Sequence, residues 1–220
     1  MTVIFSDVCT KGGIRNLNLS LDLSRITLLF DPPENLSRAI LKVLVGLDEL
    51  WQGEIQVDGI PHRQFLDQEP QLRNFGYIFD EGIMLSNLSL KENLMLPLRW
   101  LNPNLEQEET DKRIQSWMEK FALKLDLSQR PVAYRAGELK LLSYVRTLML
   151  APRVLFIVDP FYILNKRERD ILYGVLRGLS KISYPMLIAS IDDDFGAGFA
   201  DEIIDLNEMQ DYFALAASLS

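Results

Sequence analysis

The sequence predicts an α/β fold in which helices cover a mostly parallel core sheet. Short apolar runs rich in β-branched and aromatic residues alternate along the chain with segments of helical periodicity. Two of these runs, Val154–Val158 and Met186–Ile191, are apolar throughout except for Ser190. Strands that are buried on both faces of a parallel sheet have this composition, because helices cover both sides of such a sheet.

The remaining elements follow from local periodicity and turn residues. Further strands are predicted over Thr2–Val8, Ile26–Phe30, Glu54–Val57 and Phe75–Phe79. Helical spacing of apolar residues predicts four helical stretches, taken in chain order. They are a helix beginning near Glu34, a mostly helical segment from about Leu88 to Leu125 with interruptions at Pro97 and Pro103, a helix over about Gly137–Leu150, and a short helix over Asp211–Leu219.

Composition and charge limit the possible functions. The 220 residues are 48% hydrophobic and 25% charged, which is ordinary for a folded domain. The net charge of -8 argues against a broad basic face for nucleic acid, although it leaves room for a local basic patch. The single cysteine, Cys9, excludes an intrachain disulfide. The most apolar stretch, Tyr144–Leu164, is interrupted by Arg146, Arg153 and Asp159, so membrane association is expected only through a partner.

Three segments, in this order, resemble the ATP-binding domain of ABC transporters. Leu41–Pro61 is similar to the stretch after the family's phosphate loop, Ser86–Trp100 to the segment after its Q-loop, and Arg146–Pro160 to the approach to its Walker B strand. The resemblance implies an ABC ATPase-like P-loop fold over a single domain, residues 1–220, with an antiparallel β part at the N-terminus and a helical subdomain over about 83–135. Within the family, the ENLMLPLR segment looks closest to ATPase subunits of bacterial Mce-type lipid-transport systems.

The segment that aligns with the phosphate loop departs from the family pattern GxxxxGK[ST], in which backbone N–H groups and a lysine hold phosphate and a hydroxyl binds Mg²⁺. The replacements are Asp31 and Leu36 for the two glycines, Ser37 for the lysine and Arg38 for the hydroxyl residue, with Ala39 next. We expect Glu34 to act as a built-in anion at the helix N-terminus, and Arg38 to reach toward Glu34 or Asp31. A plain strand-to-helix turn without ligand is the favoured interpretation, and residual nucleotide binding through Arg38 is the alternative.

The Q-loop and the signature motif are also altered. Asp80 stands where the family has the Q-loop glutamine; it is interpreted as a solvated loop acid, with metal binding as the alternative. The segment aligned with the LSGGQ signature, which in the family contacts the γ-phosphate bound by the opposite subunit, retains Gly137 but has Arg135 at the serine position and the acidic Glu138. Arg135 touching a partner's phosphate is a second hypothesis for this segment.

The Walker B and switch positions complete the pattern. Asp159 occupies the position of the family's catalytic glutamate, and the preceding Val158 replaces the metal-binding aspartate. Asp159 is interpreted as a leftover acid or a cap for the next helix. Ile191 stands at the position of the switch histidine, and the one histidine, His62, is expected to be a surface residue. The sequence predicts no metal site, no catalytic residue and no bound cofactor, and leaves binding of ATP and Mg²⁺ in doubt.

These replacements favour a non-catalytic subunit of a bacterial membrane transport complex. Hydrolysis needs positioned phosphates, neutralised charge and an oriented water, and the residues for each are replaced. The expected partners are a transmembrane transporter subunit, docked through the region near Ile83–Trp100, and a second copy or an active ABC ATPase. The expected location is the cytoplasmic face of the cell membrane. Two alternatives stay open: a weak, divergent ATPase that uses Arg38 and Asp159, and a soluble scaffold or regulator.

Overall fold

The computed structural model describes residues 1–31, 36–68, 75–104, 106–191 and 198–207. Its centre is a parallel sheet of five strands, which confirms the predicted parallel core. The spatial order is β6 (Phe75–Ile78), β7 (Val154–Val158), β8 (Met186–Ser190), β3 (Ile26–Phe30) and β9 (Glu202–Asp205). Every pairing in this sheet is parallel.

A second, antiparallel sheet lies beside it and confirms the antiparallel part implied for the N-terminus. Its spatial order is β2 (Leu17–Asp22), β1 (Thr2–Thr10), β4 (Leu50–Val57) and β5 (Ile60–Pro61). The predicted strand Thr2–Val8 is thus two residues longer, and the strand predicted from Glu54 begins at Leu50. The sequence analysis did not predict β2, β5 or β9.

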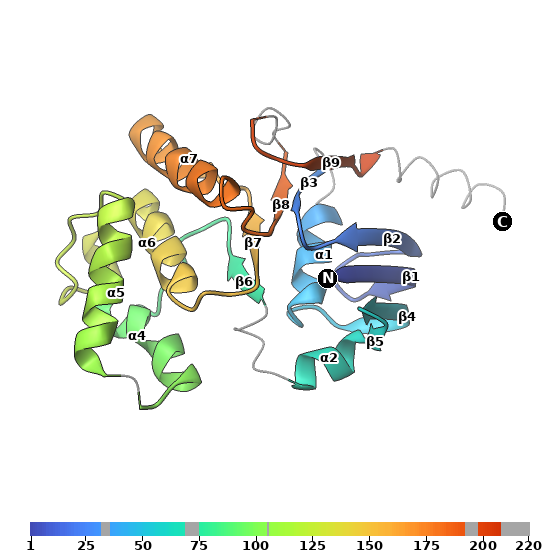
Figure 1. Cartoon of the computed structure of the whole chain (residues 1–220), viewed down its shortest axis with the longest axis horizontal. Helices are drawn as coiled ribbons and strands as arrows, with labels where there is room; N and C mark the ends of the chain where they lie inside the picture. The colour runs from blue at the N-terminus through green and yellow to red at the C-terminus, as the bar shows by residue number, and fades with distance from the viewer. Residues whose placement is uncertain (32–35, 69–74, 105, 192–197, 208–220) are drawn as a thin grey trace.

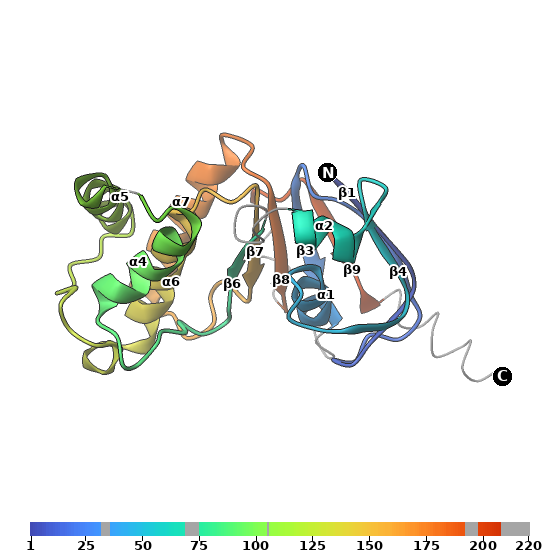
Figure 2. The same cartoon turned by 90° about the horizontal axis from the view of Figure 1, so that it is seen from below.

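The helices gather mostly at one end of the molecule (Figure 1). They are α1 (Leu36–Leu44), α2 (His62–Gln68), α4 (Leu90–Leu101), α5 (Gln107–Lys120), the short 3-10 turn Pro131–Ala133, α6 (Ala136–Leu148) and α7 (Lys166–Ser180). Figure 1 shows α4, α5, α6 and α7 together beyond β6 and β7, whereas α1 lies between the two sheets. The view turned by 90° shows the same separation (Figure 2).

Two details of the helix predictions change. The helical stretch Leu88–Leu125 is two helices, α4 and α5, and Pro97 lies inside α4 instead of interrupting it. A capping box of Ser89 and Glu92 fixes the start of α4, since each side chain bonds the backbone of the other. Helices α2 and α7 were not predicted, and the predicted helix Asp211–Leu219 lies outside the described residues.

Both faces of the parallel sheet are buried, which explains its continuous apolar strands. Successive side chains of a strand point to opposite faces. In β7, Leu155 and Ile157 join the core shared with α4, α6 and α7, whereas Phe156 and Val158 join the core shared with α1 and the antiparallel sheet. All five residues of β7 are buried, so the sheet is a rigid base for the loops that leave its edge.

Candidate functional site: a charge cluster at the carboxyl edge of the parallel sheet

Four charged side chains meet where the parallel strands end. Parallel strands share one carboxyl edge, and the loops that follow them form the usual ligand site of such sheets. Asp80 follows β6, Asp159 follows β7 directly, and Arg38 lies in the first turn of α1, which follows β3. Lys140, from α6, completes the set. The topology therefore brings together residues that are up to 121 positions apart in the chain.

Arg38 lies between the two carboxylates. Its Nη1 donates to Asp80 Oδ2 at 2.6 Å, and its Nη2 donates to Asp159 Oδ2. The carboxylate of Asp159 is the more enclosed of the two, at 10% exposed against 29% for Asp80. Burial lowers the pKa of the Arg38 guanidinium, but Asp159 and then Asp80 outweigh this effect, so the net shift is upward. Arg38 therefore remains charged and neutralises both acids.

Lys140 lies below this pair with no exposed surface. Its Nζ donates to the backbone carbonyls of Asp80, at 2.8 Å, and Asp159, at 2.5 Å. Burial lowers the pKa of the Lys140 ammonium to about 7, although the carboxylates of Asp159 and Asp80 act in the opposite direction. The lysine thus ties both carboxyl-edge loops to α6. Lys140 was not among the predicted site residues; its signal in the sequence is a lysine between Leu139 and Leu141 in the predicted helix.

These contacts correct three expectations. Arg38 was expected to reach toward Glu34 or Asp31, but its guanidinium contacts Asp80 and Asp159; Glu34 lies outside the described residues. Asp80 is paired with a cation and is not simply a solvated loop acid. Asp159 is neither a leftover acid nor a helix cap, since it pairs with Arg38 and accepts from the backbone N–H of Ile191 at 3.4 Å.

The beginning of α1 carries its own anion. The backbone N–H of Ser37 donates to Asp31 Oδ2 at 2.9 Å, and Asp31 is 1% exposed. The first N–H groups of a helix attract negative charge, and in phosphate-binding loops they bind the ligand. Here Asp31 occupies one of them and acts as a built-in anion; the expected role of Glu34 lies outside the described residues. Leu36 and Ala39, in the same turn, contribute apolar side chains to the core beside the parallel sheet.

The N-terminus of α6 is also occupied by carboxylates. Glu138 bonds the backbone N–H of Arg135 at 3.0 Å and so caps the helix. Arg135 Nη2 donates at 3.0 Å to Glu168, which is buried at the start of α7. The same carboxylate packs so closely on Gly137 that a Cβ there would clash with it. Glu168 was not among the predicted site residues, although Asn165 and Glu168 have the spacing of a capping box and form one.

The two remaining predicted positions, Ile191 and His62, form no hydrogen bond or ion pair with Arg38 or Lys140. The Ile191 side chain, at the switch position, is 63% exposed next to the cluster. His62 is 8% exposed, so the expected surface position was wrong. Its Nε2 lies 2.9 Å from the carbonyl of Leu44, the last residue of α1, and burial lowers its pKa. In this position a neutral imidazole completes the end of the helix.

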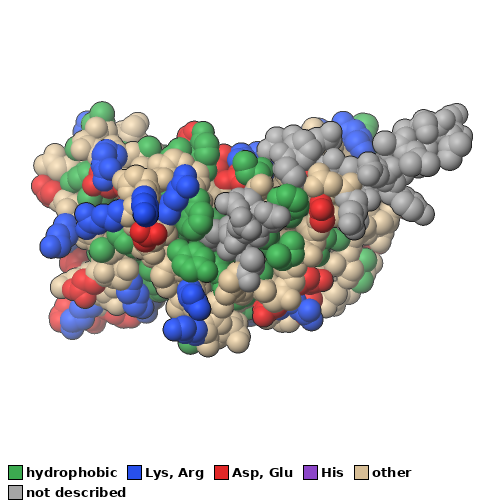
Figure 3. All heavy atoms as spheres, turned by 90° about the horizontal axis from the view of Figure 1, so that it is seen from above, with side chains coloured by type: hydrophobic (Ala, Val, Ile, Leu, Met, Phe, Trp, Pro, Cys, Tyr) green, Lys and Arg blue, Asp and Glu red, His purple; other side chains and the backbone are tan. Residues whose placement is uncertain are grey.

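The described residues lack two features, a metal-binding cluster and a membrane-spanning helix. Among them, no group of three or more His, Cys, Asp or Glu side chains is arranged to hold a metal ion. None of the described helices is long and apolar enough to cross a bilayer. Figure 3 shows Lys and Arg side chains spread over the helix-rich end on one face, interspersed with acidic ones.

The fold and the position of the cluster define an α/β domain of the phosphate-loop class, in which loops at the carboxyl edge of a parallel sheet form the site. The chain belongs to the ABC transporter family, whose sequence profile matches residues 39–161. It shares 25% identity with the sulfate/thiosulfate import ATP-binding protein CysA of Mesostigma viride, over 94% of this chain and 60% of that protein. It shares 24% identity with the molybdate/tungstate import ATP-binding protein WtpC of Archaeoglobus fulgidus, over 87% of this chain and 78% of that protein.

Solved structures agree on the fold. A dimeric bacterial ABC transporter cassette superimposes with a TM-score of 0.79 at 18% identity, covering 92% of this chain and 93% of that one. An ATP-binding subunit of an ABC transporter gives a TM-score of 0.74 at 20% identity, covering 98% and 94%. The chain spans only 60% of the length of CysA. None of these comparisons bears on the Mce-type subfamily, which stays a prediction.

Proposed function

We propose that the chain is a non-catalytic ABC subunit of a membrane transport complex, which contributes its fold and docking surfaces and not ATP hydrolysis. The observation that carries the proposal is the position of Arg38. By their resemblance to the family's motifs, Asp80 and Asp159 stand at positions that serve Mg²⁺ and water, and here a guanidinium lies between their carboxylates. A second cation in contact with the same oxygens would be repelled by the first.

The described residues around the cluster fit Mg-ATP poorly for a second reason. A triphosphate needs free N–H groups at the helix start and positive charge beside them. Asp31 already bonds the N–H of Ser37, and Ser37 replaces the lysine of the family pattern. Arg38, the nearest described cation of α1, is engaged by two carboxylates. The alternative of a weak ATPase that uses Arg38 and Asp159 would require this ion pair to open.

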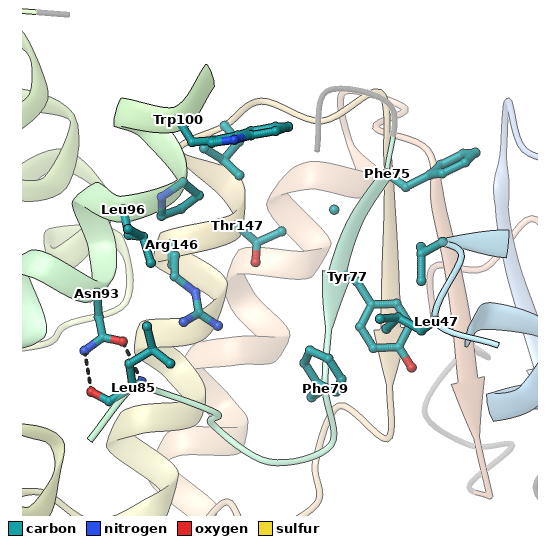
Figure 4. A pocket seen from close by; sticks show the side chains of 14 residues that line it. Leu47, Phe75, Tyr77, Phe79, Leu85, Asn93, Leu96, Trp100, Arg146 and Thr147 are labelled. Carbon is teal, nitrogen blue, oxygen red and sulfur yellow. Dashed lines mark hydrogen bonds between the residues drawn. The ribbon is translucent and has the colours of Figure 1, made fainter. Parts of the chain in front are cut away.

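The proposed docking surface is a groove between β6 and the helices α4 and α6. It has a volume of about 610 Å³. Large apolar side chains line it although they are strongly exposed: Leu47 at 56%, Leu85 at 48%, Leu96 at 51% and Trp100 at 65%. Contiguous exposed apolar surface of this kind marks protein interaction sites. The groove overlaps the region near Ile83–Trp100, and we propose that the helical subdomain over about 83–135 binds a transmembrane subunit here (Figure 4).

The remaining parts of the proposal follow from this arrangement. The subunit would lie on the cytoplasmic face of the membrane, held there by its partner, and pair with a second copy or with an active ABC ATPase. The relatives are named for the import of sulfate, thiosulfate, molybdate and tungstate, so an oxyanion importer is the transport class that they favour. An Mce-type lipid-transport system is the second candidate, supported by the ENLMLPLR segment alone.

Calorimetry of Mg-ATP binding to the purified chain tests the proposal. The protein concentration must allow detection of a millimolar dissociation constant, and an ATPase of known activity from the same family serves as the positive control. No heat of binding is the expected result. Clear binding that Arg38→Ala abolishes would instead establish the divergent ATPase.

A further inference from the structure

The groove between β6 and the helices α4 and α6 contains a guanidinium that no carboxylate of the described residues neutralises. Arg146 extends from α6 into the groove, between Leu85 and Leu96 (Figure 4). Its one hydrogen bond to a described residue runs from Nη1 to the sulfur of Met84 at 3.5 Å, and a thioether is a weak acceptor. Burial lowers the pKa of Arg146, and no acid of the described residues opposes this effect.

The other N–H groups of this guanidinium can be reached from the groove. An arginine side chain carries five N–H donors, and among the described residues only Nη1 of Arg146 has a partner. Within the same residues, the fully enclosed side-chain polar atoms without a partner belong to Thr27 and Tyr144, so Nε and Nη2 of Arg146 are not enclosed. A carboxylate in the groove could therefore accept from both, which is the two-bond geometry in which arginine binds carboxylates most strongly.

The groove has the size and the lining of a small-molecule site. Its volume of about 610 Å³ lies within the range of about 300–1,000 Å³ that is typical of such sites. Its walls are mostly apolar or aromatic, from Leu47 and Tyr77 on one side to Trp100 on the other. The amide of Asn93 is used internally, since it accepts from the N–H of Leu85 at 2.7 Å and donates to the carbonyl of Leu85 at 3.0 Å. The described lining residues therefore offer a ligand one charge in an apolar surround.

We propose that the groove binds a dissolved amphiphilic carboxylate, a small molecule with an apolar body and one carboxylate head. The head pairs with Arg146, and the body lies against Leu96 and Trp100 on one wall and Tyr77 on the other. A neutral apolar molecule would bury the guanidinium without a counter-charge, so the groove selects against it. Because the groove is also the proposed docking surface, a bound ligand would exclude the transmembrane subunit; this consequence alone rests on the proposed function.

A series of three probes tests both parts of the ligand. Octanoate, its neutral analogue 1-octanol and the shorter hexanoate are titrated into the purified full chain, and binding is followed by calorimetry and by tryptophan emission, which Trp100 reports from within the groove. Octanoate should bind at least about 10-fold more tightly than 1-octanol, because only octanoate pairs with the guanidinium. Hexanoate should bind about 15-fold more weakly than octanoate, because it buries two fewer CH₂ groups. Equal affinities of octanoate and 1-octanol, or no binding of octanoate by either readout, would overturn the proposal.

Variants of the chain then locate the site. Arg146→Gln should weaken octanoate binding by about 10-fold or more and leave 1-octanol binding unchanged. Arg99→Gln, which removes the same charge from α4 outside the groove, should change neither. Leu96 is 51% exposed, so Asp and Asn are both accommodated there; Leu96→Asp should weaken octanoate binding more than Leu96→Asn, because it offers Arg146 a carboxylate from within the chain. An affinity for octanoate that Arg146→Gln leaves unchanged, or equal effects of the two changes at Leu96, would overturn the proposal.

Flotation with lipid vesicles distinguishes a dissolved ligand from a membrane surface, because phosphatidylserine headgroups also carry a carboxylate. The chain should float no more with vesicles of phosphatidylserine and phosphatidylcholine than with vesicles of phosphatidylcholine alone. Flotation that depends on Arg146, without binding of octanoate, would assign the groove to a membrane surface and overturn the proposal. Nucleotide and partner subunit are absent from all of these assays, so their failure is distinct from a failure of the proposed function, which calorimetry of Mg-ATP decides.

Discussion

Removal of Arg38 tests whether the charge cluster holds the carboxyl-edge loops together. Arg38→Ala leaves the carboxylates of Asp80 and Asp159 without the cation that they share. Loss of one partner from a fully buried pair costs about 3–5 kcal/mol. Because the side chains of Arg38 and Asp80 are 30% and 29% exposed, water screens part of the loss. We therefore expect the free energy of unfolding to fall by about 2–3 kcal/mol.

Urea unfolding followed by tryptophan fluorescence measures this change, since the chain contains three tryptophans. In thermal melts a loss of this size corresponds to about 4–12 °C for a chain of this length. Lys112→Ala is the matched control, because its ion pair with Glu108 joins side chains that are 74% and 77% exposed. Its melting temperature should stay within error of the wild-type value.

A double-mutant cycle of Arg38→Ala with Asp159→Ala isolates the pair itself. We expect a coupling free energy of about 1 kcal/mol or more, the usual range for residues in one ion-pair network. If Arg38→Ala destabilises the chain no more than Lys112→Ala, or if the two changes are additive, the cluster does not hold these loops. Arg38 would then not serve as a built-in cation in place of Mg²⁺.

Three further predictions concern other parts of the molecule. The pKa of Lys140 is lowered from 10.5 to about 7, so between these pH values the unfolded chain binds more protons than the folded one, and the free energy of unfolding rises with pH. Lys140→Met should reduce this slope by up to about 1.4 kcal/mol per pH unit. Urea midpoints of the wild-type chain and the variant that shift in parallel from pH 7 to 10 would contradict the burial of Lys140. Gly137→Ala should lower the free energy of unfolding by about 1–3 kcal/mol, because the new Cβ clashes with the Glu168 carboxylate. In the double variant with Glu168→Ala the loss, measured by urea unfolding, should be smaller than the sum of the two single losses. Trp100→Ala should leave the melting temperature unchanged but reduce copurification with the membrane partner, whereas Trp51→Ala, equally exposed but outside the groove, should change neither.

The sequence predicted the parallel core well because burial on both faces leaves a continuous apolar run, as in Val154–Val158. It missed β2 of the antiparallel sheet and β9 at the edge of the parallel sheet, since neither strand has a continuous apolar run. Helix α7 is a different case. Its apolar residues Leu172, Leu176 and Leu179 repeat at helical spacing and Asn165 caps its start, so the sequence does carry the signal for this helix.

The contacts of the site could not be predicted from local sequence. Arg38 is 42 positions from Asp80 and 121 from Asp159, and nothing near either acid in the chain indicates an arginine partner. The pairing follows from strand order, which places β7 next to β6 and brings the start of α1 to the same edge. His62 shows the same limitation: its burial depends on the carbonyl at the end of α1, a contact made only in the folded chain.

The charges of the cluster balance one another, which explains how the chain can keep acids at the Q-loop and Walker B positions. Asp80 and Asp159 carry two negative charges, and Arg38 and Lys140 carry two positive ones when the lysine is protonated. In a family site the same two positions face Mg²⁺ and the attacking water. Retaining acids there without a metal would leave buried carboxylates unpaired, which is strongly destabilising. Arg38 removes this penalty by pairing with both acids, so the fold neutralises its carboxyl edge from within the chain. On the proposed non-catalytic role, a variant made to bind nucleotide would need more than a new lysine at position 37, because Arg38 would still occupy the carboxylates that a bound Mg²⁺ would need.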